Sequence, residues 1–129
     1  MRYTLKLMLL AVLVALVAGC STTPSGAGGN WVGHSETGKA SFYADRYQNQ
    51  KTASGERYKA RQKTAAHRTL PFGSQVRVTN IHNGRSVVVR VNDRGPFVRG
   101  RVIDLSKSAF SSIGDTSAGL LDVRIEVIR

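Results

Sequence analysis

Three segments in the second half of the chain alternate β-branched and polar residues with a period of two. They cover residues 76–79, 87–91 and 123–127. Because successive side chains of a strand point to opposite faces, this alternation predicts half-buried β-strands. The pair Asn83-Gly84 lies between the first two segments and predicts a hairpin, since both positions of a tight turn prefer positive φ.

Helical spacing is confined to residues 106–113, where Leu105, Ala109 and Ile113 share one face and Gly114 follows as a stop. The segment from residue 39 to residue 129 is near the lower size at which one core suffices without disulfides or metals. Only 7% of the 129 residues are aromatic, so the core must consist mostly of Val, Ile, Leu and Ala. We therefore expect a mainly β domain with one or two short helices, closed into a barrel because closure removes exposed strand edges.

The first twenty residues carry a different signal. A basic start with Arg2 and Lys6 precedes an uncharged apolar run over residues 7–18, which is shorter than the roughly twenty residues that span a bilayer. This pattern is typical of a secretory signal peptide. Residues 16–20 (LVAGC) resemble a bacterial lipobox, and the single cysteine of the chain, Cys20, is where such a signal is lipidated. The alternative is an ordinary signal peptide with an incidental cysteine.

These features divide the chain into three parts. We expect a lipoprotein signal peptide over residues 1–19, a lipidated cysteine and flexible linker over residues 20–38, and one domain over residues 39–129. The linker is rich in Gly, Ser and Thr and cannot bury enough apolar area to fold. Ser21 after the cysteine resembles the sorting signal of enterobacterial lipoproteins. It favours the periplasmic face of the outer membrane, with the inner membrane as the less favoured alternative.

The charge balance points to a polyanionic partner. The chain has 19 basic and 8 acidic residues, which gives a formal charge of +11. Binding to nucleic acid would require a similar excess of basic residues, but an exported protein does not encounter nucleic acid. One cysteine and three histidines cannot supply a typical structural zinc set, and we expect neither a metal nor a cofactor.

Three residues are candidates for chemistry. Asp93 follows a Val-rich segment directly before the Gly-Pro break at residues 95–96, which predicts a position at the barrel rim. Glu56 lies in a polar turn, and His67 ends a short apolar stretch. Structural alternatives remain open for each, because Asp93 could cap a turn or pair with Arg94, Glu56 could be a solvated charge, and His67 could be a buried polar side chain.

Five motifs stand in order along the domain. They are residues 39–43 (KASFY), 52–56 (TASGE), 64–73 (TAAHRTLPFG), 89–97 (VRVNDRGPF) and 101–106 (RVIDLS). Together they resemble the rare lipoprotein A (RlpA) family, and the likeness covers residues 38–129. The resemblance implies a six-stranded double-psi β-barrel related to expansins and family 45 endoglucanases.

The resemblance also implies an activity. It suggests a periplasmic, endolytic peptidoglycan transglycosylase that prefers glycan strands without stem peptides and leaves 1,6-anhydro-muramic ends. No water needs activation, because the C6 hydroxyl of the substrate attacks its own anomeric carbon.

Asp93 would be the acid and base, Glu56 would hold the substrate or stabilise positive charge, and His67 would hydrogen-bond a carboxylate or the sugar. Further residues expected to contact substrate are Tyr43, Ser54, Arg94 and Asp104, of which Asp104 could equally be structural. We expect the protein to act as a monomer on peptidoglycan, attached to the membrane through its N-terminal lipid.

Two features qualify this interpretation. Residues 45–50 (DRYQNQ) replace a His-Gly pair that many members carry, which affects one wall of the groove. Arg90 and Arg94 lie close to Asp93 in sequence, and a guanidinium beside a carboxyl lowers its pKa, whereas a general acid needs the opposite shift. Two other functions therefore remain open: a non-catalytic peptidoglycan-binding lipoprotein, and a passive link between outer membrane and wall.

Overall fold

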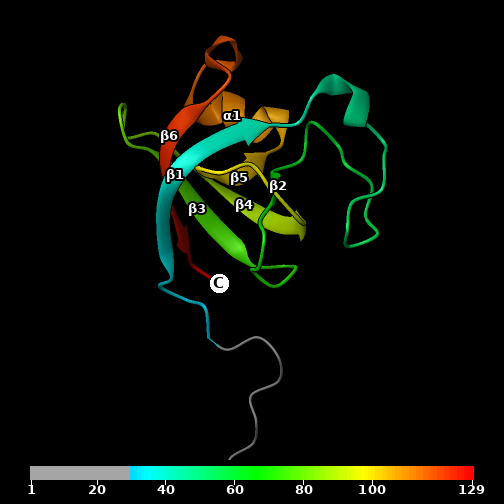
Figure 1. Cartoon of the computed structure of the whole chain (residues 1–129), viewed down its shortest axis with the longest axis horizontal. Coiled ribbons are helices and arrows are strands. Elements are labelled where there is room, and N and C mark those ends of the chain that lie inside the picture. The colour runs from blue at the N-terminus through cyan, green and yellow to red at the C-terminus, as the bar shows by residue number, and fades with distance from the viewer. Residues whose placement is uncertain (1–29) are drawn as a thin grey trace, which may run out of the picture.

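The computed structural model describes residues 30–129, so the expected signal peptide and Cys20 lie outside the described residues. Six strands close into a barrel in the order β1-β5-β2-β4-β3-β6 (Figure 1). The strands are β1 (Ser35–Phe42), β2 (Thr64–Ala66), β3 (Gln75–Asn80), β4 (Ser86–Asp93), β5 (Arg101–Leu105) and β6 (Leu121–Val127). The expected mainly β, six-stranded barrel is confirmed.

The barrel mixes parallel and antiparallel neighbours. β1 pairs with β5 and β2 pairs with β4 in parallel, while the other four neighbouring pairs are antiparallel. A parallel pair cannot be joined by a tight hairpin, so the chain must cross over between its strands. β1 and β2 lie on either side of β5, and the connection between them is long and stands out from one side of the barrel (Figure 1).

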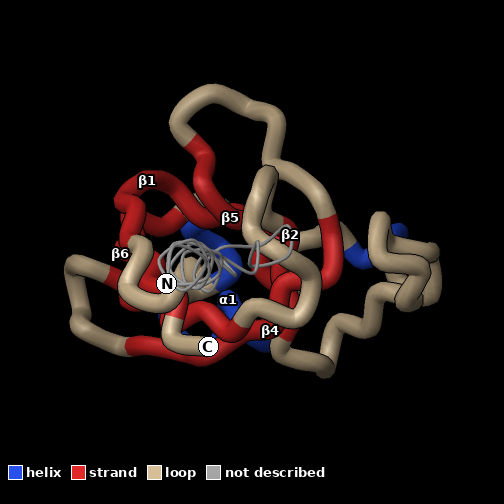
Figure 2. The backbone as a smooth tube through the Cα atoms, turned by 90° about the horizontal axis from the view of Figure 1, so that it is seen from below, coloured by secondary structure: helices blue, strands red, loops and turns tan. Residues whose placement is uncertain are grey.

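The core fills the barrel and extends under the one α-helix that residues 30–129 form. Inward-facing positions of β3, β4 and β6 are buried, as the alternation of the sequence predicts. The helix α1 (Lys107–Ile113) adds Ala109, Phe110 and Ile113 to this core. Figure 2 shows the strands arranged as a ring. The N-cap of α1 is Ser106, whose hydroxyl accepts a hydrogen bond from the Ala109 N–H.

The local expectations are confirmed with two differences. The hairpin between β3 and β4 has a longer loop than a two-residue turn, and only Gly84 of the Asn83-Gly84 pair adopts positive φ, 73°. The Asn83 side chain instead donates to the Ile113 carbonyl and accepts from the Arg85 N–H. The barrel also begins earlier than residue 39, because β1 starts at Ser35 and pairs with β6 from that residue on.

Besides α1, the described part of the chain has two short 3-10 helices, η1 (Asp45–Tyr47) and η2 (Thr116–Ala118). Within residues 30–129, no helix has the length and apolar character to cross a membrane.

Candidate active site

Asp93 is the last residue of β4, and three donors hold its carboxylate. Oδ2 accepts from the Tyr43 hydroxyl at 2.5 Å. Oδ1 accepts from the backbone N–H groups of Ala53 at 2.8 Å and Arg94 at 2.9 Å. The side chain is half-buried, so the rim position expected from the Gly-Pro break corresponds to an oriented carboxylate that solvent still reaches.

Asp104 lies on β5 and is also half-buried. Its Oδ1 accepts a short hydrogen bond from the Ser41 hydroxyl of the parallel neighbour β1. Burial, with a smaller contribution from the charge of Asp93, raises the pKa of Asp104, although the Ser41 hydroxyl and Arg101 act against this shift. Asp104 is therefore the carboxyl group of this region that is biased toward its protonated form.

The barrel register brings these two acids together. Ala66 of β2 pairs with Asp93 on one side and with Asp104 on the other. β4 and β5 therefore lie two strand spacings apart, with β2 between them, which puts the backbones of the two acids about 10 Å apart. Side chains in register point to the same face of the sheet. Both carboxylates line one open pocket with a volume of about 460 Å³.

The long connection between β1 and β2 forms the aromatic wall of this pocket. The ring of Tyr43 stacks on Tyr58, with centroids 4.4 Å apart, and meets the edge of Tyr47 at 5.9 Å. Burial and the adjacent Asp93 raise the pKa of Tyr43, so its hydroxyl remains a donor. The remaining lining residues include Arg46, Gln50, Lys51 and Arg101. Residues 45–50, which differ from the pattern of the RlpA family, thus contribute to the pocket wall.

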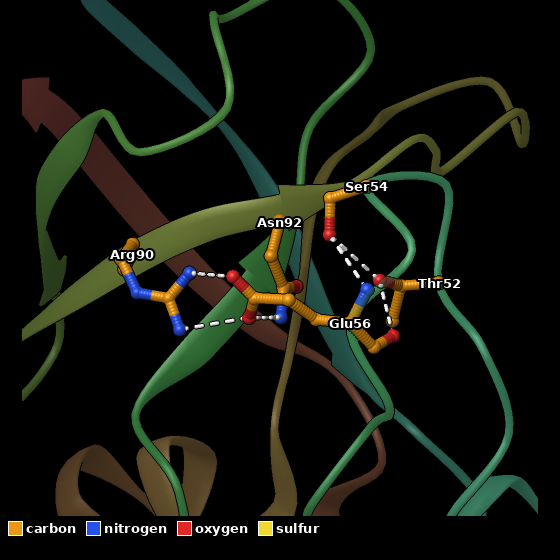
Figure 3. Close-up of polar contacts among 5 residues, drawn as sticks. All are labelled: Thr52, Ser54, Glu56, Arg90 and Asn92. Carbon is orange, nitrogen blue, oxygen red and sulfur yellow. Dashed lines mark hydrogen bonds and ion pairs between the residues drawn. The ribbon is translucent and has the colours of Figure 1, made fainter.

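Glu56 lies beside this pocket and faces β4 (Figure 3). Its carboxylate accepts two hydrogen bonds from the Arg90 guanidinium, at 2.7 and 2.9 Å, and one from the Asn92 amide at 3.2 Å. These partners, Arg90 first, hold the pKa of Glu56 below its usual range. The ion pair fastens the turn at residues 52–56 to β4, and that turn presents the Ala53 N–H to Asp93.

The same turn contains Ser54. Its backbone N–H donates to the Asn92 carbonyl at 3.2 Å, and its hydroxyl accepts from the Glu56 N–H at 3.3 Å. Thr52 completes the turn with a hydroxyl 3.0 Å from that of Ser54 (Figure 3). Ser54 therefore organises the loop and does not line the pocket.

His67 is buried, with 2% of its surface exposed. Its Nδ1 accepts from the N–H groups of Thr69 and Leu70, both at 3.1 Å, which assigns the proton to Nε2. Nε2 then donates to Glu36 on β1 at 2.7 Å. Burial lowers the pKa of His67, and the Glu36 carboxylate opposes that shift. The backbone N–H of His67 donates to the Asp93 carbonyl, but the imidazole points away from the pocket and joins β1 to the loop after β2.

Neither nearby guanidinium binds the Asp93 carboxylate. Arg90 is paired with Glu56. Arg94 lies over the Phe72 ring at 4.0 Å and donates to the His67 carbonyl at 3.1 Å. Although both arginines are close to Asp93 in sequence, their guanidinium groups bind other partners in the folded domain.

Of the residues expected to act, the structure brings Asp93, Asp104 and Tyr43 into one pocket. It places Glu56, Ser54, Arg94 and His67 around that pocket as supports of its backbone. Sequence reasoning did not identify Ser41 as the partner of Asp104, because the two residues are 63 positions apart. Among residues 30–129, no three His, Cys, Asp or Glu side chains come together in a way that could hold a metal ion.

Comparisons with known proteins bear on the family and the fold of this domain. Residues 35–125 match the domain family described as "Lytic transglycolase". The chain belongs to this family. This lytic transglycolase domain is 59% identical over 93 residues to the probable endolytic peptidoglycan transglycosylase RlpA of Nostoc sp.. The match covers 70% of this chain and 25% of that protein. The domain is 55% identical over 96 residues to the endolytic peptidoglycan transglycosylase RlpA of Vibrio cholerae, with 74% and 36% covered. The resemblance to the RlpA family is confirmed, and the chain spans about a quarter to a third of the length of these relatives.

Solved structures support the same fold for this lytic transglycolase domain. The Streptomyces papain inhibitor matches with a TM-score of 0.62 and 28% identity over 76% of this chain and 97% of that chain. A mutant expansin of Clavibacter michiganensis, solved with cellohexaose, matches with a TM-score of 0.59 and 23% identity, covering 74% of this chain and 50% of that one. At that identity the expansin shows the shared barrel alone, which is the double-psi type expected from the sequence.

Proposed function

We propose that this chain is a lytic transglycosylase that cleaves MurNAc–GlcNAc bonds in the glycan strands of peptidoglycan. The observation that carries the proposal is the pair of carboxylates, Asp93 and Asp104, lining one open pocket beside an aromatic wall. The family match and the names of the relatives support the same reaction and the same polymer.

Asp104 is the better general acid of the pair. A group that protonates a glycosidic oxygen near neutral pH needs a raised pKa, and burial provides this for Asp104. Asp93 accepts hydrogen bonds on both of its oxygens, which fixes the orientation of its carboxylate. We therefore assign proton transfer to Asp104 and stabilisation of positive charge at the anomeric carbon to Asp93. The sequence alone had suggested Asp93 as the acid and base, Glu56 as the group that stabilises positive charge, and Asp104 as a structural or substrate-contacting residue.

The reaction needs no second nucleophile from the protein. Asp104 donates its proton to the bridging oxygen as the bond from that oxygen to the anomeric carbon breaks. The C6 hydroxyl of the same muramic sugar then bonds to the anomeric carbon, and its proton passes to the Asp104 carboxylate. The product carries a 1,6-anhydro ring, and Asp104 is again protonated for the next turnover.

Glu56 and His67 act as positioning residues in this scheme. Glu56 fastens the turn that supplies the Ala53 N–H to Asp93, and His67 anchors the segment after β2 whose backbone pairs with Asp93. Their effect on catalysis passes through the orientation of Asp93. Because one chain supplies both acids, we also propose that the protein acts as a monomer.

The test compares two variants on two substrates. Residues 21–129 are incubated with peptide-free glycan strands, and the products are identified by mass spectrometry. We expect 1,6-anhydro ends from the wild type and a loss of about 10²–10⁴ in rate for Asp104→Asn. An aryl glycoside with a good leaving group needs no protonation, so Asp104→Asn should lose less activity on it than on the strands, although the base is still missing. Asp93→Asn should lose as much activity on the aryl glycoside as on the strands.

Other outcomes would change the proposal. Reducing ends in place of anhydro ends would indicate a hydrolase. Bound but uncut strands would favour the alternative of a non-catalytic peptidoglycan-binding lipoprotein. Rescue of Asp93→Asn on the aryl glycoside would return the acid role to Asp93.

The cellular setting is proposed from the sequence. We infer that Cys20 is lipidated and holds the domain at the periplasmic face of the outer membrane, because residues 16–20 have the pattern of a lipobox. Two or three acyl chains are enough for durable anchoring. Cys20→Ala should move the protein from the membrane fraction to the soluble fraction, and continued membrane binding after a salt wash would contradict the anchor.

A further inference from the structure

The pocket that holds the two acids is also lined by three basic side chains. Arg46 and Lys51 come from the connection between β1 and β2, and Arg101 begins β5. Elsewhere in the described domain, four Lys or Arg side chains, Arg90 and Lys107 among them, are paired with carboxylates, and several exposed ones such as Arg124 are not. The ion pairs found among residues 30–129 include none of the three pocket cations.

Arg101 already has an electrostatic role toward the acids. It lies close enough to Asp104 to oppose the upward shift of the pKa of that carboxyl group. Arg46 and Lys51 have no such counter-charge in the structure. The Arg46 guanidinium donates to the Tyr47 hydroxyl at 3.1 Å and lies 4.9 Å from the centre of that ring, so both of these partners are neutral.

Arg46 is connected to the reacting end of the pocket by contacts, and Lys51 by its place in the chain. Tyr47, beneath Arg46, meets Tyr43 edge-on, and the Tyr43 hydroxyl binds Asp93. Lys51 precedes by two residues the Ala53 N–H that also binds Asp93. A sugar placed against Asp93 therefore has an aromatic wall with two uncommitted positive charges beside it.

We propose that Arg46 and Lys51 form a carboxylate subsite that binds the free lactyl carboxylate of the muramic sugar at the cleavage point. The inference rests on the proposed function, since that substrate brings the carboxylate next to the bond that is cut. Attachment of a stem peptide converts this carboxylate to an amide, which removes the charge and adds bulk. The subsite gives a physical basis for preferring strands without stem peptides.

The test uses two forms of one substrate with the mature chain. Peptide-free strands are compared with the same strands after their lactyl carboxylates are converted to methylamides, which removes the charge with little added bulk. We expect the wild type to cut the free-acid form with a KM lower by about fivefold or more, the scale of an exposed charge pair. The double variant Arg46→Gln/Lys51→Gln should lose this difference through KM, with kcat little changed.

Control variants keep the result interpretable. Arg124→Gln removes an exposed charge on β6 outside the pocket and should keep the wild-type preference. The charge reversal Arg46→Glu should reverse the preference toward the methylamide form. Added salt should weaken the wild-type preference, because exposed charge pairs are screened.

The failures of the two proposals are distinguishable. Equal cleavage of both forms by the wild type, or an unchanged preference in the double variant, would overturn the subsite and leave the transglycosylase intact. Cleavage of neither form would overturn the proposed function and the subsite with it.

Discussion

Replacing His67 by alanine tests whether this residue supports the fold or contacts substrate. The imidazole makes three hydrogen bonds, to the N–H groups of Thr69 and Leu70 and to the Glu36 carboxylate, and it is 2% exposed. Its removal leaves the buried Leu70 N–H without a partner, which costs about 1–3 kcal/mol. The emptied volume and the lost bond to Glu36 add to this cost. We expect the free energy of unfolding to fall by about 2–4 kcal/mol in total.

The loss can be followed by urea unfolding of residues 21–129 with tryptophan fluorescence. Trp31 is the single tryptophan of the chain and packs against the core beside His34, with the two rings 5.2 Å apart. His82→Ala is the matched control, since His82 is 71% exposed and its pairing with Asp122 is at the surface. That variant should change stability by no more than about 0.5 kcal/mol.

One result would refute this reasoning. If His67→Ala unfolds at the same urea concentration as the wild type but no longer cleaves glycan strands, the structural role is wrong. His67 would then contact substrate or a reacting carboxylate, as the sequence suggested. If stability falls as expected, activity measured well below the unfolding midpoint should be reduced but present.

Three further predictions concern pH, packing and positioning. The pKa of His67 in the folded chain lies below the unfolded value near 6.5, so the unfolded chain binds more protons as the pH falls. The urea midpoint should therefore decline below about pH 6.5. This decline should be absent in His67→Gln. The pKa of Glu36 is also lowered, because hydrogen bonds from the histidines outweigh the raising effect of burial, so a second loss of stability should begin below its ordinary value of 4.5. Gly38→Ala should cost about 1–3 kcal/mol in thermal unfolding, since a Cβ there would meet the buried Val102 side chain at 2.5 Å, and an unchanged melting temperature would contradict this packing. Glu56→Gln should lower kcat by about 10- to 100-fold with little change in the free energy of unfolding, because it loosens the turn that orients Asp93. A large loss of stability in this variant would argue against a positioning role.

The sequence by itself was sufficient for the fold class and for four local elements, three strands and the helix. Alternation of β-branched residues depends only on the two-residue repeat of a strand, so β3, β4 and β6 could be predicted from short windows. Ser106 and Gly114 mark the ends of α1 for an equally local reason, since they bond to the backbone groups that the helix leaves free. The ordered motifs indicated the family, and Asp93 could be expected at a strand end from the Gly-Pro that follows it.

The partners of the acidic residues were decided by the tertiary structure. Asp93 and Asp104 become neighbours because both pair with Ala66 of β2, a register that barrel closure sets and that no local spacing reveals. The same holds for Ser41 on Asp104 and for Arg90 on Glu56, which are separated by 63 and 34 residues.

His67 shows the same limit most clearly. Its sequence neighbours are compatible with a catalytic histidine or with a buried one, and only the position of Glu36 on β1 distinguishes the two. The direction of a side chain and the solvation of a carboxyl group depend on long-range contacts. The sequence therefore determined which groups are present, and the closed barrel determined which of them share a pocket.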